Sequence, residues 1–223
     1  YTGHRIPVYS ISMIKRLEDI DLSQRYSYAD YLTWRFAERI ELLRGRIFKM
    51  SPAPNTRHQQ VSGKIGLAIG MHLRGSKCQV FAAPFDVRLP ISADLSVSRK
   101  YKKRASQLPD GKTMTVVQPD LCVYCDDAKL DERGGIGAPE LAIEILSPGN
   151  TRREMKDKFE IYQEAGVEEY WVVEPNDAFV LVYSLQKGEF VGSRPYVSGD
   201  TLTSKVLPGF SFPLEEIFPL PEE

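Results

Sequence analysis

The stretch that decides the fold is LAIEILSPGNTRREMKDKFEIYQEAGVEEYWVV, residues 141–173. Its first six residues form an apolar run interrupted by one carboxylate, which predicts a buried strand. Asn150 or Thr151 can then cap a helix that runs to about Ala165. A second apolar run at 169–173 predicts another strand. Strand, helix and strand in succession are typical of an α/β protein, in which helices cover the faces of a sheet.

The same patterns predict further elements on both sides of this stretch. The predicted helices cover residues 27–36 and 57–73, and the predicted strands cover residues 39–43, 46–50, 79–89, 116–125, 179–185 and 190–191. The polar or glycine-rich residues 92–114 and 126–138 are expected to be loops. We therefore expect a central mixed sheet flanked by helices, with an extra C-terminal hairpin. Residues 27–223 would form a single domain after an N-terminal extension, residues 1–26.

The charge balance limits the kind of partner. Lys and Arg number 29 against 30 Asp and Glu, which gives a net charge of −1. This value excludes a uniformly basic nucleic-acid coat, although it is compatible with a local basic groove. No run approaches the roughly 18 apolar residues of a membrane span. The first residues lack the apolar core of a signal peptide, so we expect a cytoplasmic protein without a membrane partner.

The chain has three cysteines, Cys78, Cys122 and Cys125. This low, odd number argues against a disulfide framework and favours a reducing compartment. Cys122 and Cys125 form a C-x-x-C motif, which can be a redox pair or half of a zinc site. However, the motif lies in a predicted strand, where residues three apart point to opposite faces. A structural role is therefore favoured for both.

Two acidic residues interrupt apolar strands. Asp120 follows Pro119 at the start of one run, and Glu144 lies in the middle of another. Unpaired charges in buried strands are costly, so such carboxylates usually have a partner or a metal. If the two strands are neighbours, both carboxylates could bind one hard divalent cation such as Mg²⁺. Alternatively, Asp120 could cap a turn.

A lysine on the following helix completes the group. Lys158 lies between Met155 and Tyr162 of the apolar stripe, so it borders the face turned to the sheet. The helix rises about 10 Å from Thr151 to Lys158, which is about the length of the strand from Glu144 to its end. Lys158 could thus meet Glu144 and stabilise negative charge on a phosphoryl group. The alternatives are a structural ion pair with Glu144 or a solvated lysine.

At this point the sequence resembles the Uma-type restriction endonucleases of the PD-(D/E)XK nuclease superfamily. The resemblance rests on Pro119-Asp120, on Glu144-Ile145-Leu146-Ser147-Pro148, on Lys158 with Tyr162, and on Gly166-Val167-Glu168-Glu169-Tyr170-Trp171. The segment Glu41-Leu42-Leu43-Arg44-Gly45-Arg46, followed by Met50-Ser51-Pro52, is also similar to a family segment. The resemblance covers roughly residues 28–175 and implies a restriction-endonuclease-like fold.

The resemblance also implies roles for individual residues. Asp120, Glu144 and the Ile145 carbonyl would bind Mg²⁺ or Mn²⁺. The superfamily usually places a lysine two residues after the glutamate, where this chain has Leu146. In this family the lysine looks displaced to the next helix, and Lys158 fits that place.

Two residues in the N-terminal half also match the family pattern. Glu41 would be an auxiliary acidic residue near the metal, although a solvated strand charge is the alternative. His58 would be a base or a phosphate contact, although its helix position favours a hydrogen-bonded, half-buried histidine.

Several basic residues are candidates for contact with nucleic acid. Arg152, Arg153 and Lys156 gather at the start of the predicted helix that runs to about Ala165, where the helix dipole already favours anions. The basic run at 99–104 could contact the phosphate backbone, or it could be an ordinary solvated loop.

These residues together predict a divalent-metal-dependent endonuclease that hydrolyses DNA. The alternative is a catalytically weak or inactive module that binds nucleic acid or supports assembly on the same fold, and Leu146 favours it. A nuclease that prefers RNA is a third possibility, although no aromatic stacking platform supports it. Because nucleases that cut both strands often pair about a two-fold axis, we also expect a homodimer.

Overall fold

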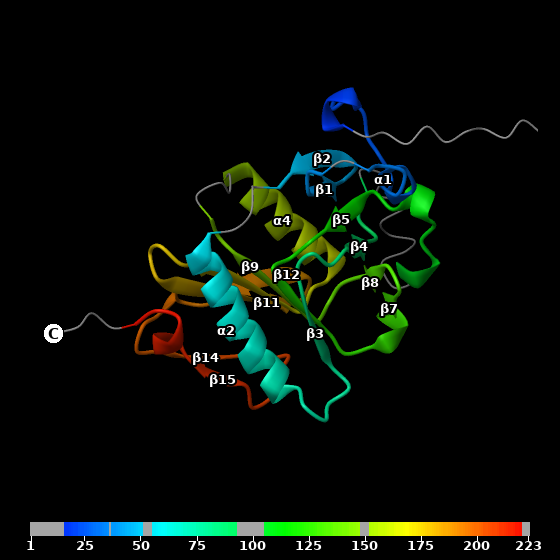
Figure 1. The fold of residues 1–223 in the computed structure, drawn as a ribbon. Coiled ribbons are helices and arrows are strands. Elements are labelled where there is room, and N and C mark those ends of the chain that lie inside the picture. Colours follow the sequence, from blue (N-terminus) through cyan, green and yellow to red (C-terminus); the bar gives the residue numbers. More distant parts are fainter. Residues whose placement is uncertain (1–15, 36, 51–54, 93–104, 148–151, 220–223) are drawn as a thin grey trace, which may run out of the picture.

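The computed structural model describes residues 16–35, 37–50, 55–92, 105–147 and 152–219. The basic run at 99–104, the capping position at 150–151 and the first part of the N-terminal extension lie outside these residues. The α/β class predicted from the sequence is confirmed. However, the strands form two large sheets and a small separate hairpin rather than one central sheet (Figure 1).

The first sheet has six strands in the order β2-β1-β5-β4-β8-β7. Their bounds are Arg46–Lys49, Ile40–Leu43, Thr115–Val117, Val87–Leu89, Gly134–Ile136 and Leu130–Asp131. The predicted hairpin around Arg44-Gly45 is confirmed, since β1 and β2 pair from Leu43–Arg46 to Ile40–Lys49. Both turn residues have positive φ values, 53° and 83°, as a two-residue hairpin turn requires.

The second sheet has seven strands, and its main path is β12-β11-β10-β9-β6-β3. Their bounds are Glu189–Gly192, Phe179–Gln186, Glu169–Glu174, Leu141–Ile145, Leu121–Tyr124 and Gln79–Ala82, with β13, Tyr196–Val197, beside β11. Among the described strands of this second sheet, only β9 and β10 pair in parallel, because the helix α4 connects them. The predicted C-terminal hairpin is confirmed as β11–β12.

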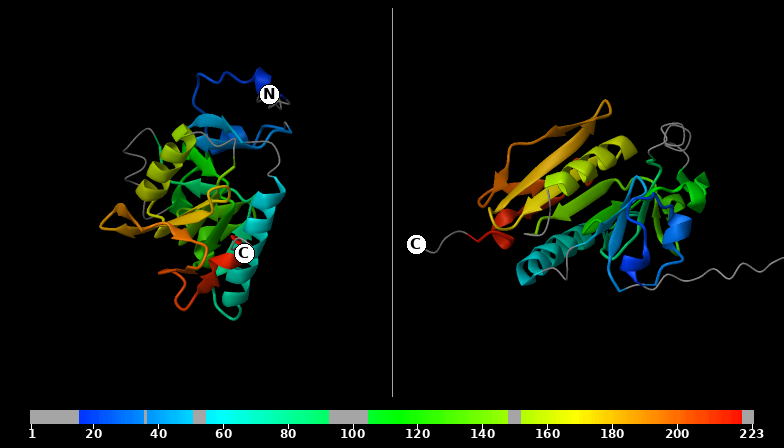
Figure 2. Two further views of the ribbon diagram at one scale, coloured as in Figure 1. Left: turned by 90° about the vertical axis from the view of Figure 1, so that its left-hand side faces the viewer. Right: turned by 90° about the horizontal axis from the view of Figure 1, so that it is seen from above.

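Two long helices cover opposite faces of the second sheet. Helix α2, Thr56–His72, lies on one face, and helix α4, Arg152–Ala165, lies on the other (Figures 1 and 2). The N-terminal helix, α1, spans Tyr28–Tyr31 and is shorter than the predicted helix at 27–36. It begins with a capping box between Ser27 and Asp30. Short 3-10 turns occupy Leu17–Asp19, Ala105–Gln107, Asp110–Lys112, Asp127–Lys129 and Leu214–Glu216.

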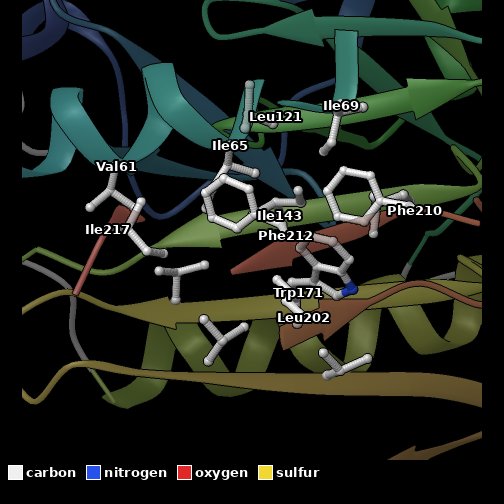
Figure 3. Packing of buried hydrophobic residues seen from close by; sticks show 14 of the residues in the cluster. Val61, Ile65, Ile69, Leu121, Ile143, Trp171, Leu202, Phe210, Phe212 and Ile217 are labelled. Atoms are coloured by element: carbon white, nitrogen blue, oxygen red, sulfur yellow. The ribbon is translucent and has the colours of Figure 1, made fainter. Parts of the chain in front are cut away.

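The larger core lies between α2 and the sheet. Val61, Ile65 and Ile69 of α2 point toward the central strands, as the 3.6-residue period predicts (Figure 3). A small hairpin is formed by β14, Thr201–Thr203, and β15, Ser211–Pro213. Its Leu202 and Phe212 pack into this core. A second apolar cluster lies under α4 and joins the two sheets.

Two predicted strands are each broken in the middle. Residues 79–89 divide into β3 and β4, which belong to different sheets and are separated by the cis peptide Ala83-Pro84. Residues 116–125 divide into β5 and β6 around Pro119, which has no N–H for a sheet ladder. The loop predicted at 126–138 contains the short strands β7 and β8. An apolar pattern does not reveal such transfers between sheets.

The cysteines are only partly as predicted. Cys122 and Cys125 point to opposite faces of the sheet, and Cys122 is a buried free thiol. Cys125, however, forms a disulfide with Cys78, which the low cysteine number argued against. The two lie next to the paired residues Gln79 and Tyr124, at one end of β3 and β6. Within the described residues, no helix is long and apolar enough to cross a membrane.

Candidate metal centre

Asp120 and Glu144 lie on neighbouring strands. The antiparallel pairing of β6 with β9 sets Leu121 against Ile143, so the preceding Asp120 stands opposite Glu144 and on the same face. The Asp120 carboxylate is anchored, because its Oδ2 accepts a hydrogen bond of 2.7 Å from the Ile145 backbone N–H. The two strands are neighbours, as the hypothesis of a shared cation requires, and Asp120 is bound across the strands instead of capping a turn.

Glu144 and Lys158 are in direct contact, as the helix and strand lengths predict. Lys158 Nζ lies 3.0 Å from Glu144 Oε1, which also accepts a hydrogen bond of 2.6 Å from Tyr162. Both side chains are buried, which excludes a solvated lysine. Burial raises the pKa of Glu144 to about 7, with Asp120 and Glu41 acting in the same direction and Lys158 opposing them. Burial disfavours the Lys158 ammonium, but Glu144 and Glu41 raise its pKa, so it stays protonated.

Glu41 reaches the same lysine from the other sheet. Its Oε1 lies 3.1 Å from Lys158 Nζ and accepts a hydrogen bond of 2.7 Å from the Gln118 backbone N–H. Glu41 is only 1% exposed, so the alternative of a solvated strand charge is wrong. Its Oε2 is buried and has no hydrogen-bond partner among the residues that the structure describes. This free carboxylate oxygen is compatible with a nearby cation or water.

His58 lies in the first turn of α2, and its backbone N–H bonds to the side chain of Asn55, the residue that caps the helix. Its ring is buried, and Nε2 lies 3.3 Å from Asp120 Oδ1. Burial acts against the charged ring, but Asp120, the Ile145 carbonyl and Glu144 raise the pKa of His58 overall. The ring therefore faces the group of oxygens that the family pattern assigns to a metal.

The basic residues at the start of α4 are not part of this group. Arg152, Arg153 and Lys156 are exposed. Arg153 lies 3.8 Å from Asp157, and Lys156 lies 3.7 Å from Glu160. These are surface contacts one turn apart on the helix, so the three residues remain candidates for nucleic-acid contact only.

Two residues of the site were not predicted to have a role there. Tyr162 donates to Glu144, and its spacing of four residues from Lys158 could have indicated this, since such residues share a helix face. Gln118 fixes Glu41 through its backbone and bonds Asp86 through its side chain, Nε2 to Oδ1, at 2.8 Å. No sequence pattern reveals Gln118, because its partners come from distant strands.

The donor atoms fit a hard cation. The Asp120 carboxylate, Glu144 Oε2 and the Ile145 carbonyl are oxygens, and Glu144 uses only Oε1 for Lys158 and Tyr162. Mg²⁺ takes one or two protein carboxylates and keeps several waters. Over the described part of the chain, no group of three or more His, Cys, Asp or Glu residues is arranged so that it could hold a metal ion by itself. These oxygens can therefore form an open metal site, in which the protein supplies few of the ligands.

Comparisons with known proteins show the family and the fold of the chain. The family model Uma2, described as "Putative restriction endonuclease", matches residues 28–215, which is most of the chain. A crystal structure of a "putative nuclease belonging to DUF820" from Anabaena variabilis superposes with a TM-score of 0.63 at 16% identity. The match covers 86% of this chain and 97% of that one. No curated protein matches the sequence significantly. The chain belongs to the Uma2 family and has the restriction-endonuclease-like fold.

Proposed function

We propose that this protein is an endonuclease that uses Mg²⁺ or Mn²⁺ to hydrolyse phosphodiester bonds of DNA. The observation that carries the proposal is the opposed pair Asp120 and Glu144, backed by the buried ammonium of Lys158. Two carboxylates on adjacent strands with one lysine behind them combine cation binding with charge stabilisation. The family to which the chain belongs supports the reaction class.

The roles of the residues follow from their contacts. Asp120, Glu144 and the Ile145 carbonyl would hold the divalent ion, which would supply an activated water and polarise a phosphoryl oxygen. Lys158 holds Glu144 through Oε1 and keeps one positive charge beside the reacting phosphate, where it stabilises developing negative charge. Glu41 is a positioning residue, because it binds Lys158 from the opposite side.

A nuclease assay tests the proposal. Purified protein is incubated with supercoiled plasmid DNA, linear duplex, single-stranded DNA and RNA, in Mg²⁺, in Mn²⁺ and in EDTA. We expect DNA cleavage with either metal and none in EDTA. Asp120→Asn should abolish cleavage, since it removes the charge while keeping the shape of the side chain. Lys158→Arg should reduce it strongly, since a guanidinium does not fit the position of the ammonium.

The control is Asp177→Asn, an exposed carboxylate in a turn between β10 and β11. This variant should cleave like the wild type, whereas an inert Asp120→Asn preparation, purified in the same way, excludes a contaminating nuclease. An inert wild type on every substrate would remove the proposal. Inert protein that still binds DNA in a salt-dependent way would instead support the non-catalytic binding module. Cleavage of RNA alone would change the substrate class.

A homodimer remains part of the proposal, without a surface assigned to it. The apolar C-terminal hairpin, β11–β12, does not offer such a surface, because it packs within the chain on both faces. Val180 and Val182 belong to the core under α2, while Leu181 and Tyr183 pack on the α4 side. Sedimentation equilibrium with and without DNA would show whether two chains associate.

A further inference from the structure

A pocket lined by arginines lies next to the candidate metal centre. It has a volume of about 190 Å³ and is lined by residues of the β1–β2 hairpin and of α4. Four arginines line it: Arg25, Arg44, Arg46 and Arg153. They come from three separate segments of the chain, so the cluster results from folding rather than from a basic run in the sequence.

The chain fixes this cluster by hydrogen bonds. The turn residue Gly45 receives a bond of 2.8 Å from the Tyr26 N–H at its carbonyl and donates its own N–H to Met114. These bonds hold the segment of Arg25 against the hairpin, and the Arg25 guanidinium donates to the Arg44 carbonyl. A side chain at Gly45 would be strained, because φ is 83° and an added Cβ would lie 2.6 Å from Met114 Cε and 3.0 Å from Arg25 Cβ. The positions of the arginines are thus determined by the backbone.

The pocket carries an excess of positive charge. Arg44 is paired with Glu164 at 2.6 Å, and Arg153 lies 3.8 Å from Asp157. No carboxylate in the described ranges forms an ion pair with Arg25 or Arg46. Four guanidiniums near two carboxylates therefore leave about two charges unbalanced, as counted from these contacts. Arginine forks match phosphate oxygens in a bidentate geometry, so an anion with several oxygens would fit here.

The position of the pocket relates it to the metal centre. Asp157 of the pocket precedes Lys158 on α4, and Leu43 of the pocket lies two residues beyond Glu41 on β1. The helix rises about 7.5 Å from Arg153 to Lys158, and β1 advances about 6.6 Å from Glu41 to Leu43. A duplex strand advances about 3.4 Å for each nucleotide. The pocket therefore lies on the order of one to two nucleotides from Lys158 along a DNA strand.

We propose that this arginine pocket binds a backbone phosphate of DNA about one to two nucleotides from the bond that the metal centre cleaves. The inference rests on the proposed function and adds to it a contact that sets the register of the strand. Because phosphate contacts carry no base information, the pocket positions the duplex without specifying its sequence.

The test uses two exposed arginines whose reversal leaves the core intact. Arg46→Glu and Arg153→Glu are combined, and the affinity for a short fluorescein-labelled DNA duplex is measured by anisotropy in EDTA over a range of salt. We expect at least a tenfold loss of affinity. Because each phosphate contact adds about 0.9 to the salt slope, loss of this one phosphate contact should also lower the slope by about one. The matched control is Arg74→Glu, an exposed arginine at the far end of α2, which should change affinity by less than about twofold.

The outcomes separate this inference from the proposed function. If the double variant binds DNA like the Arg74→Glu control, the phosphate site is wrong, whether or not the wild type cleaves. If it loses DNA binding while the wild type proves inert as a nuclease, the phosphate site stands and the proposed reaction fails. If it loses affinity only for inorganic phosphate and keeps its DNA affinity, the pocket serves a free anion and the inference is overturned.

Discussion

The ammonium of Lys158 lies 3.1 Å from the Glu41 carboxylate, and both side chains are almost fully removed from water. Glu144 shares the same ammonium at 3.0 Å, so one cation balances two buried acids from different sheets. Replacing Lys158 with methionine would leave both carboxylates without a counter-charge. We expect Lys158→Met to lower the free energy of unfolding in urea by about 3–5 kcal/mol, the usual cost of breaking a buried ion pair.

Lys156 on the same helix is the matched control. Its side chain is 75% exposed, and it lies 3.7 Å from Glu160. Lys156→Met should therefore change the free energy of unfolding by no more than about 0.5 kcal/mol. Equal losses in the two variants would mean that burial of Lys158 makes no difference to its pairing, contrary to the contacts seen here.

Cation binding at Asp120 and Glu144 should stabilise the folded protein. A ligand that binds only the folded state at about one hundred times its Kd adds about 2.7 kcal/mol. We expect Mn²⁺ to raise the Tm of the wild type, and EDTA to reverse the change. Asp120→Asn should show no such rise, because the variant lacks a charged ligand. Asp177→Asn should respond like the wild type. A similar rise in both variants would place the ion elsewhere.

The contact between Glu144 and Lys158 could be predicted from the sequence because it is local. One strand, a short connection and a helix of known rise leave little freedom in where Lys158 lies. The contact of Glu41 with Lys158 could not be predicted in the same way. It depends on the pairing of β1 with β5, set by Leu42 opposite Val116, and sequence periodicity contains no such long-range register.

The sheet boundaries were missed for a related reason. The apolar run around Pro119 continues on both sides, although β5 and β6 belong to different sheets. The break is what places Asp120 at the edge of β6 and exposes the Gln118 N–H to Glu41. The break at Pro119, which the apolar pattern does not reveal, therefore also positions residues of the site, as is common where function requires irregular backbone.

Two aspartates of the first sheet region, Asp86 and Asp131, should respond to pH with opposite signs. Burial raises the pKa of Asp86 above 3.8, although hydrogen bonds from Gln118 and Tyr31 act against it. Its ionisation therefore costs stability once the pH rises above 3.8. Asp86→Asn should be more stable than the wild type at neutral pH, and the difference should shrink on acidification.

Asp131 gives the opposite case. Burial acts to raise its pKa, but hydrogen bonds from Arg88 and Arg133 lower it below 3.8 overall. Its contribution to stability is thus present above pH 3.8 and is lost as the pH falls through the lowered value. Asp131→Asn should be less stable than the wild type at neutral pH and approach it in acid. Urea unfolding of both variants between pH 3 and 7 checks this, and shifts of the same sign would contradict the assigned environments.

The Cys78–Cys125 disulfide joins the end of the α2–β3 connection to the end of β6 and closes a loop across 47 residues. Such a cross-link restricts the unfolded chain and typically contributes about 2–4 kcal/mol. We expect dithiothreitol to lower the free energy of unfolding of the wild type by this amount. The Cys78→Ser, Cys125→Ser double variant should start from the lower value and be insensitive to the reductant. Cys122→Ser, which leaves the bridge intact, should keep the full response. Thiol titration of denatured protein should find one free thiol before reduction and three after it, and three at the start would show that the bridge does not form.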